Sequence, residues 1–177
     1  MSSSRMVLAW SILLSNVFVG LSDANAQPSL EGKHELEKSI QGQFVVVTAY
    51  FVKEPVCHNP KSWLWGSDLQ CPKQVIGSLA ITWGEQELFI PASAYMDLAA
   101  VYHLAIEPAS QGFTVNIRGG DASTSYRAVL EFEGVPVPDI AGVLKRRIVR
   151  SGEFPGDAWE ETRYTFNTGA EPEPPIR

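Results

Sequence analysis

The sequence has little of what metal centres and common enzyme families need. It contains only two cysteines and three histidines, and the histidines lie far apart, so the ligand spacing of a zinc site is missing. It has no phosphate-binding glycine motif, no GxSxG or SxxK nucleophile motif and no HExxH pattern, since Lys38 stands where a second histidine would follow His34-Glu35. We therefore expect no bound metal or cofactor and a protein that acts by binding.

Positive charge and long apolar runs are also scarce. The 177 residues include 14 Lys and Arg against 20 Asp and Glu, a formal net charge of −6. This balance argues against a nucleic-acid partner, because binding to phosphates requires a basic face. No run of 18 or more apolar residues forces a transmembrane helix. With 45% hydrophobic residues, the composition is that of an ordinary globular domain.

The first 26 residues have the parts of a secretory signal peptide. Arg5 supplies the positive charge, residues 6–21 form a short apolar segment, and Ala24-Asn25-Ala26 offers a cleavage site flanked by small residues. We expect export, with a mature chain that begins at Gln27 in the periplasm of a Gram-negative host or outside the cell. The alternative is an uncleaved anchor; after cleavage no transmembrane segment is expected.

The two cysteines fit an oxidising compartment. Cys57 and Cys71 are the only possible pair, and we expect a disulfide between them rather than a metal site. In the chain-entropy account, closing a loop of about 15 residues stabilises a fold by about 3 kcal/mol.

Alternation of apolar and polar residues dominates residues 27–168, which we expect to form one domain. Such runs, separated by turns that contain glycine and proline, predict an antiparallel β-sandwich or barrel of about seven to eight strands. Helix is expected only as two turns at Gly32–Ile40 and as a short segment at Ala92–Ala100. Residues 169–177 contain three prolines and almost nothing apolar, so we expect a disordered tail. The clearest alternating runs are Val75–Trp83, Phe113–Ile117 and Tyr126–Phe132, whereas Phe44–Val52 is apolar on both faces and predicts a strand buried on both sides.

The segment between the cysteines is the first candidate binding site. Trp63, Leu64 and Trp65 are consecutive in it, and His58 follows Cys57. Tryptophan is enriched at interface hot spots, and a disulfide would preorganise the loop for a protein or glycan partner. The structural alternative is that the indole rings cover one end of the core.

The turn at Gly119–Ser125 is the second candidate binding site. Asp121 and Ser123 lie in it, and Tyr126 begins the strand that follows. An ordinary hairpin loop requires the same composition, which is the alternative interpretation.

One basic cluster is present, at Lys145, Arg146, Arg147 and Arg150. On a regular strand Lys145 and Arg147 would share one face and Arg146 and Arg150 the other, unless a bulge intervenes. Charge that protects an edge strand explains the cluster; an acidic partner or an anionic membrane surface is the functional alternative.

These features predict an exported, non-enzymatic binding protein. The specific hypothesis is an inhibitor or immunity-type protein that engages an enzyme or toxin of the cell envelope through the Trp63–Trp65 loop. A structural or accessory subunit of an envelope assembly, joined through strand edges, is the second class. The third is a small envelope hydrolase, with Asp97, His103 and Asp121 as candidate catalytic residues.

Overall fold

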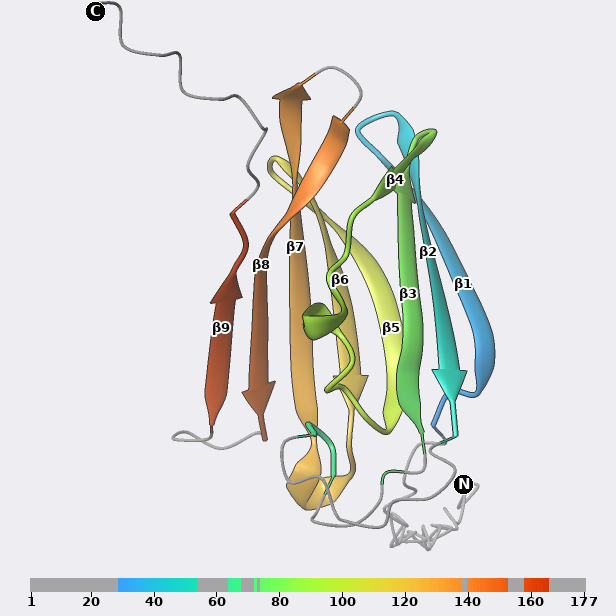
Figure 1. Ribbon diagram of the computed structural model, residues 1–177, viewed down its shortest axis with the longest axis vertical. Coiled ribbons are helices and arrows are strands. Elements are labelled where there is room, and N and C mark those ends of the chain that lie inside the picture. The colour runs from blue at the N-terminus through green and yellow to red at the C-terminus, as the bar shows by residue number, and fades with distance from the viewer. Residues whose placement is uncertain are drawn as a thin grey trace, which may run out of the picture.

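The computed structural model describes residues 29–53, 64–67, 72, 74–137, 140–152 and 158–165. These residues form two antiparallel sheets of four and five strands with a common core, so the predicted β-sandwich is confirmed (Figure 1). The expected signal peptide, disulfide and C-terminal tail, together with His58 and Trp63, lie outside the described residues. No helix in the described ranges is both long and apolar enough to cross a membrane.

The first sheet is built from neighbours in the sequence, in the order β1-β2-β3-β4. Gln41 and Gly42, both with positive φ (52° and 83°), join the first two strands in a two-residue turn of the type that hairpins favour. The predicted helix at Gly32–Ile40 is therefore wrong, since the whole segment pairs with the next strand. The strands are β1 (Gly32–Ile40), β2 (Gln43–Val52), β3 (Val75–Trp83) and β4 (Gln86–Leu88).

The second sheet also follows chain order, from β5 to β9. Its strands are β5 (Val101–Ala109), β6 (Gly112–Gly119), β7 (Tyr126–Val137), β8 (Ile140–Ser151) and β9 (Trp159–Arg163). Two 3₁₀ turns complete the described elements, η1 (Ala92–Ala94) and η2 (Ala122–Thr124). The helix expected over Ala92–Ala100 is thus reduced to one turn, because Leu98 and Ala99 form β-bridges with Trp65 and Val75 instead.

The inner faces of the two sheets enclose the core. Alternate residues of β6 and β7 are buried there, as the sequence pattern predicted. The expectation that β2 is buried on both sides is wrong, because the described residues leave the outer face of its sheet uncovered and only alternate residues of β2 are buried. Trp83 of β3 meets Phe113 of β6 edge to face with ring centroids 5.2 Å apart, and Phe113 stacks on Phe132 at 4.8 Å. These aromatic contacts join the two sheets near the end that carries β4.

A bulge in β8 changes which residues face the core. Arg146 pairs with Glu131 of β7, but Leu144 pairs with the next residue, Phe132, so Lys145 is the extra residue. Lys145 and Arg146 therefore both lie on the outer face, and Arg147 faces inward. The expectation that Lys145 and Arg147 share a face is wrong for this reason. Beyond the bulge, the N-terminal half of β8 leans toward β4 (Figure 1).

Candidate functional site

The described parts of the two predicted binding loops lie together at one end of the sandwich (Figure 1). The segment from Ala99 to Ala100 joins them. Ala99 N donates to Trp65 O at 3.0 Å, Gly120 N donates to Ala100 O at 3.0 Å, and the Tyr126 hydroxyl donates to Ala99 O at 3.0 Å. The sequence did not indicate that these two loops share an end of the fold.

Most of the predicted binding residues at this end contribute to the fold. Leu64 and Tyr126 are buried in the core, and Trp65 is half-buried against it. Asp121 and Ser123 are exposed. The Asp121 carboxylate accepts a hydrogen bond of 2.9 Å from Thr124 Oγ1, which caps η2. Among the described residues, this end therefore presents few side chains to a partner.

The three candidate catalytic residues of the hydrolase hypothesis do not form a common site, and each has different surroundings. Asp97 is ion-paired with Arg147, His103 is exposed on β5, and Asp121 caps η2. No hydrogen bond or ion pair between any two of them is found in the described ranges. Nor does this part of the chain contain a group of three or more His, Cys, Asp or Glu side chains able to hold a metal ion.

Arg147 is buried on the inner face of β8, where it pairs with a partly buried carboxylate, Asp97, and a half-exposed one, Glu160. It is 1% exposed; its Nη2 lies 2.5 Å from Asp97 Oδ2 and its Nη1 lies 2.6 Å from Glu160 Oε1 of β9. Burial raises the pKa of Asp97 above its ordinary value, and the Arg147 guanidinium opposes that increase. These ion pairs tie the segment after η1 to β8 and β9, which is a structural role.

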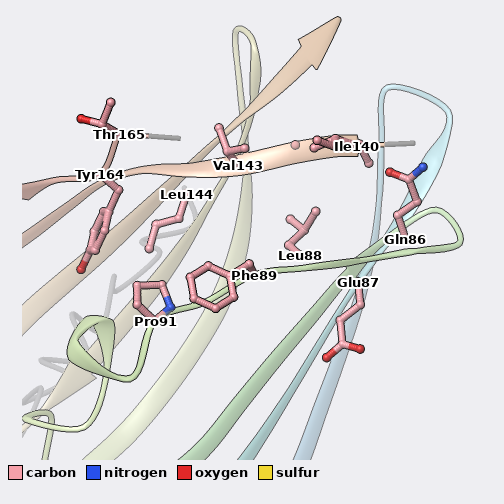
Figure 2. A pocket seen from close by; sticks show the side chains of 12 residues that line it. Gln86, Glu87, Leu88, Phe89, Pro91, Ile140, Val143, Leu144, Tyr164 and Thr165 are labelled. Atoms are coloured by element: carbon pink, nitrogen blue, oxygen red, sulfur yellow. The ribbon is translucent and has the colours of Figure 1, made fainter. Parts of the chain in front are cut away.

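A pocket of about 460 Å³ opens where β4 faces the N-terminal half of β8 (Figure 2). Its volume lies within the range of ligand sites in proteins. Figure 2 shows the two chain segments running side by side, with Leu88 and Phe89 on one and Leu144 on the other. Phe89 is 78% exposed, although phenylalanine is usually buried. The walls of the pocket are mostly apolar. The apolar side chains that line it are Leu88, Phe89, Pro91, Ile140, Val143, Leu144 and Tyr164.

The two sides of the pocket are strand edges. β4 pairs with β3, and its other edge has no strand partner in the described residues. Strand β9 pairs with only one part of β8, residues Arg146–Arg150. Just beyond β9, Tyr164 N donates a hydrogen bond of 3.0 Å to Lys145 O of β8. Ile140–Leu144 therefore has β7 on one side and, within the described ranges, no strand on the other. Such edges can pair with a further strand.

The sequence does not reveal this pocket, because its walls come from three distant segments of the chain, residues 86–91, 140–144 and 164–165. The one signal in the sequence is the run Leu88-Phe89-Ile90. Three consecutive apolar residues break the alternation of a half-buried strand, so at least one of them had to point outward.

Comparison of the chain with protein-family models, curated proteins and solved structures gave no match.

Proposed function

We propose that this chain is an exported, non-enzymatic binding protein of the cell envelope, and that its pocket accepts an extended segment of a partner protein. One observation carries the proposal: the apolar pocket lies between two strand edges that lack partners in the described residues. A strand added at such an edge supplies backbone hydrogen bonds, and its alternate side chains enter the pocket. Residues 1–26, with the features of a signal peptide, support export.

A peptide fits this site better than an apolar small molecule does. A hydrocarbon in the pocket would shield the N–H and C=O groups of the adjacent strand edge from water without bonding them. Each polar group left buried and unpaired costs about 1–3 kcal/mol. A peptide strand bonds the same groups and places an apolar side chain among Leu88, Phe89 and Leu144.

The nature of the partner decides the biological role. An enzyme or toxin as partner would make the chain an inhibitor or immunity-type protein, the role expected from the sequence. The same free edges favour a second candidate function, a subunit of an envelope assembly that receives a strand from its neighbour. Analytical ultracentrifugation of the chain alone separates the two, because a subunit that receives a strand from another copy self-associates, whereas an inhibitor stays monomeric until its target is added.

The test uses a library of ten-residue peptides displayed on phage and selected against the exported chain. We expect the selected peptides to alternate apolar residues and to slow amide hydrogen exchange at Ile140–Leu144. Phe89→Asp should weaken their binding about tenfold or more, the effect of losing an interface hot spot. The matched control is Phe44→Asp, since Phe44 is 57% exposed on β2, two strands away from β4 in the same sheet, and does not line the pocket.

Two results would contradict the proposal. One is a library from which no peptide is selected. The other is a set of bound peptides that leaves the Ile140–Leu144 amides unprotected, or whose binding Phe44→Asp weakens as much as Phe89→Asp does.

A further inference from the structure

A row of residues that contains three arginines crosses the outer face of the five-stranded sheet. The register of the strands places one residue of each strand directly opposite the next, and all five are exposed. Residues opposite each other in this way lie on the same face of a sheet. We call this set the cationic row; from β5 to β9 it consists of His103, Arg118, Arg127, Arg150 and Trp159.

The arginines of the cationic row have no acidic partner among the described residues. Arg118 and Arg150 make no side-chain hydrogen bond or ion pair there. The Arg127 guanidinium donates from Nε and Nη2 to Asn116 Oδ1, at 3.2 and 2.6 Å, and Asn116 carries no charge. Like charges directly opposite one another destabilise a sheet, so the fold does not benefit from this row.

Farther along the same strands, the outer face balances its charges. Arg146 Nη2 lies 2.7 Å from Glu131 Oε1, and Lys145 Nζ lies 2.5 Å from Glu133 Oε2. On β9, Arg163 Nε lies 2.8 Å from Glu161 Oε1. The excess of positive charge is therefore confined to a line across the strands.

Because the arginines of the cationic row lie along a line, they favour a linear anionic partner over a flat anionic surface. Neighbouring strands lie about 4.8 Å apart, so the backbone positions of Arg118, Arg127 and Arg150 follow one another across the strands at about that distance. A flat anionic membrane on this face would also cover the region of Glu131, Glu133 and Glu161, whose charges are already balanced by ion pairs, and would gain no net attraction from it. A linear anion lying along the row would contact its three arginines and none of these carboxylates.

Trp159 helps to decide between two kinds of linear anion, an acidic peptide and an acidic polysaccharide. It ends the row and is 62% exposed, so its flat ring is available for stacking. An extended acidic peptide presents carboxylates of one face about 6.8 Å apart, wider than the spacing of about 4.8 Å between strands. A chain of sugar rings offers a ring face for the indole and carboxylates that guanidinium groups bind through charge-assisted hydrogen bonds.

We propose that the cationic row binds a linear polysaccharide of uronic acids. Its carboxylates accept hydrogen bonds from Arg118, Arg127 and Arg150, and one sugar ring stacks on Trp159. No residue of the row lines the pocket between β4 and β8, so this site is independent of the peptide site proposed above.

The experiment is a calorimetric titration of the exported chain with a six-residue oligogalacturonide, followed also by tryptophan fluorescence. We expect binding that weakens as salt rises. Arg118→Gln and Trp159→Ala should each weaken it about tenfold. Arg163→Gln is the matched control, because Arg163 is an 80% exposed arginine on the same face outside the row, and it should change the affinity by less than about twofold.

Four outcomes would overturn the proposal. The first is the absence of oligogalacturonide binding. The second is equal or tighter binding of poly-glutamate, which would identify an acidic-peptide site. The third is binding only to vesicles rich in anionic lipid. The fourth is a loss of affinity from Arg163→Gln equal to that from Arg118→Gln, which would mean that binding depends only on the overall charge of the face. Phe89→Asp should leave oligogalacturonide binding unchanged, which separates this test from that of the peptide site.

Discussion

The five-stranded sheet carries arginine on both faces, in opposite surroundings. On the inner face, Arg147 is 1% exposed and has carboxylate oxygens at 2.5 and 2.6 Å. On the outer face, Arg118 is exposed and has no ion pair with any described residue. Arg147 and the exposed Arg150 lie three residues apart in one strand, so position relative to the sheet, and not the local sequence, separates the two kinds.

The difference separates charges that the fold requires from charges that it merely tolerates. A buried guanidinium is stable only when carboxylates replace the water that it has lost. An exposed guanidinium keeps its water and needs no partner, and its repulsion of a like charge is weakened by solvent and salt. The carboxylates of Asp97 and Glu160 are thus explained by folding, whereas the cationic row remains available to a ligand.

Removal of the buried charge should have the largest effect on stability. Arg147→Met leaves Asp97 largely buried beside an apolar side chain and frees Glu160 of its partner. Breaking a buried ion pair on one side costs about 3–5 kcal/mol of unfolding free energy, which urea denaturation measures directly.

Arg146→Met is the control for that experiment, since Arg146 is the neighbouring arginine on the other face of the same strand. Its guanidinium lies 2.7 Å from Glu131 and 3.8 Å from Glu161, but it is partly exposed. We expect a much smaller loss than from Arg147→Met, because solvent screens an exposed ion pair. Equal losses of unfolding free energy from Arg147→Met and Arg146→Met would show that the buried and the exposed ion pairs contribute equally to stability.

A smaller effect on stability tests whether burial or the attraction of Arg147 has the larger influence on the pKa of Asp97. Its pKa is raised in the folded chain by burial, so the folded state holds this proton more tightly than the unfolded state does. The stabilisation from this group is complete below its unfolded pKa of about 3.9 and is lost as the pH rises through the higher folded pKa. The difference in unfolding free energy between the native chain and Asp97→Asn should therefore decrease from acid toward neutral pH.

Urea denaturation of both proteins at a series of pH values checks this dependence. A difference that grows toward neutral pH would mean that the attraction of Arg147 exceeds the cost of burial, and that the pKa of Asp97 is lowered.

Most of the architecture was predictable because period-two alternation has one common cause, a strand with one buried face. Phe113, Val115 and Ile117 were expected to share a face, and all three are buried. β1 was missed because its main apolar residues, Leu36 and Ile40, are four residues apart. That spacing places them on one face of a helix and also on one face of a strand. Only pairing with β2 decides between the two.

The candidate sites were less predictable because they depend on register. The cationic row joins residues of five strands, and a shift of one residue in any strand would move its side chain to the opposite face. The bulge at Lys145 is such a shift, and nothing in the sequence Leu144-Lys145-Arg146-Arg147 marks it. Local sequence indicated a basic cluster, and the register distributes that cluster between an ion pair in the core, salt bridges on the surface and the row.

The smallest expected effect on stability tests whether the fold is indifferent to the cationic row. Arg118 lies directly opposite Arg127 and makes no side-chain bond to any described residue. Arg118→Gln should change the unfolding free energy by less than about 0.5 kcal/mol, as surface substitutions usually do, and toward greater stability because a like-charge contact is removed. Any gain should shrink in high salt, where the repulsion is screened. A loss above about 1 kcal/mol in urea denaturation would instead assign Arg118 a structural role like that of Arg147, and the two faces of the sheet would no longer differ in kind.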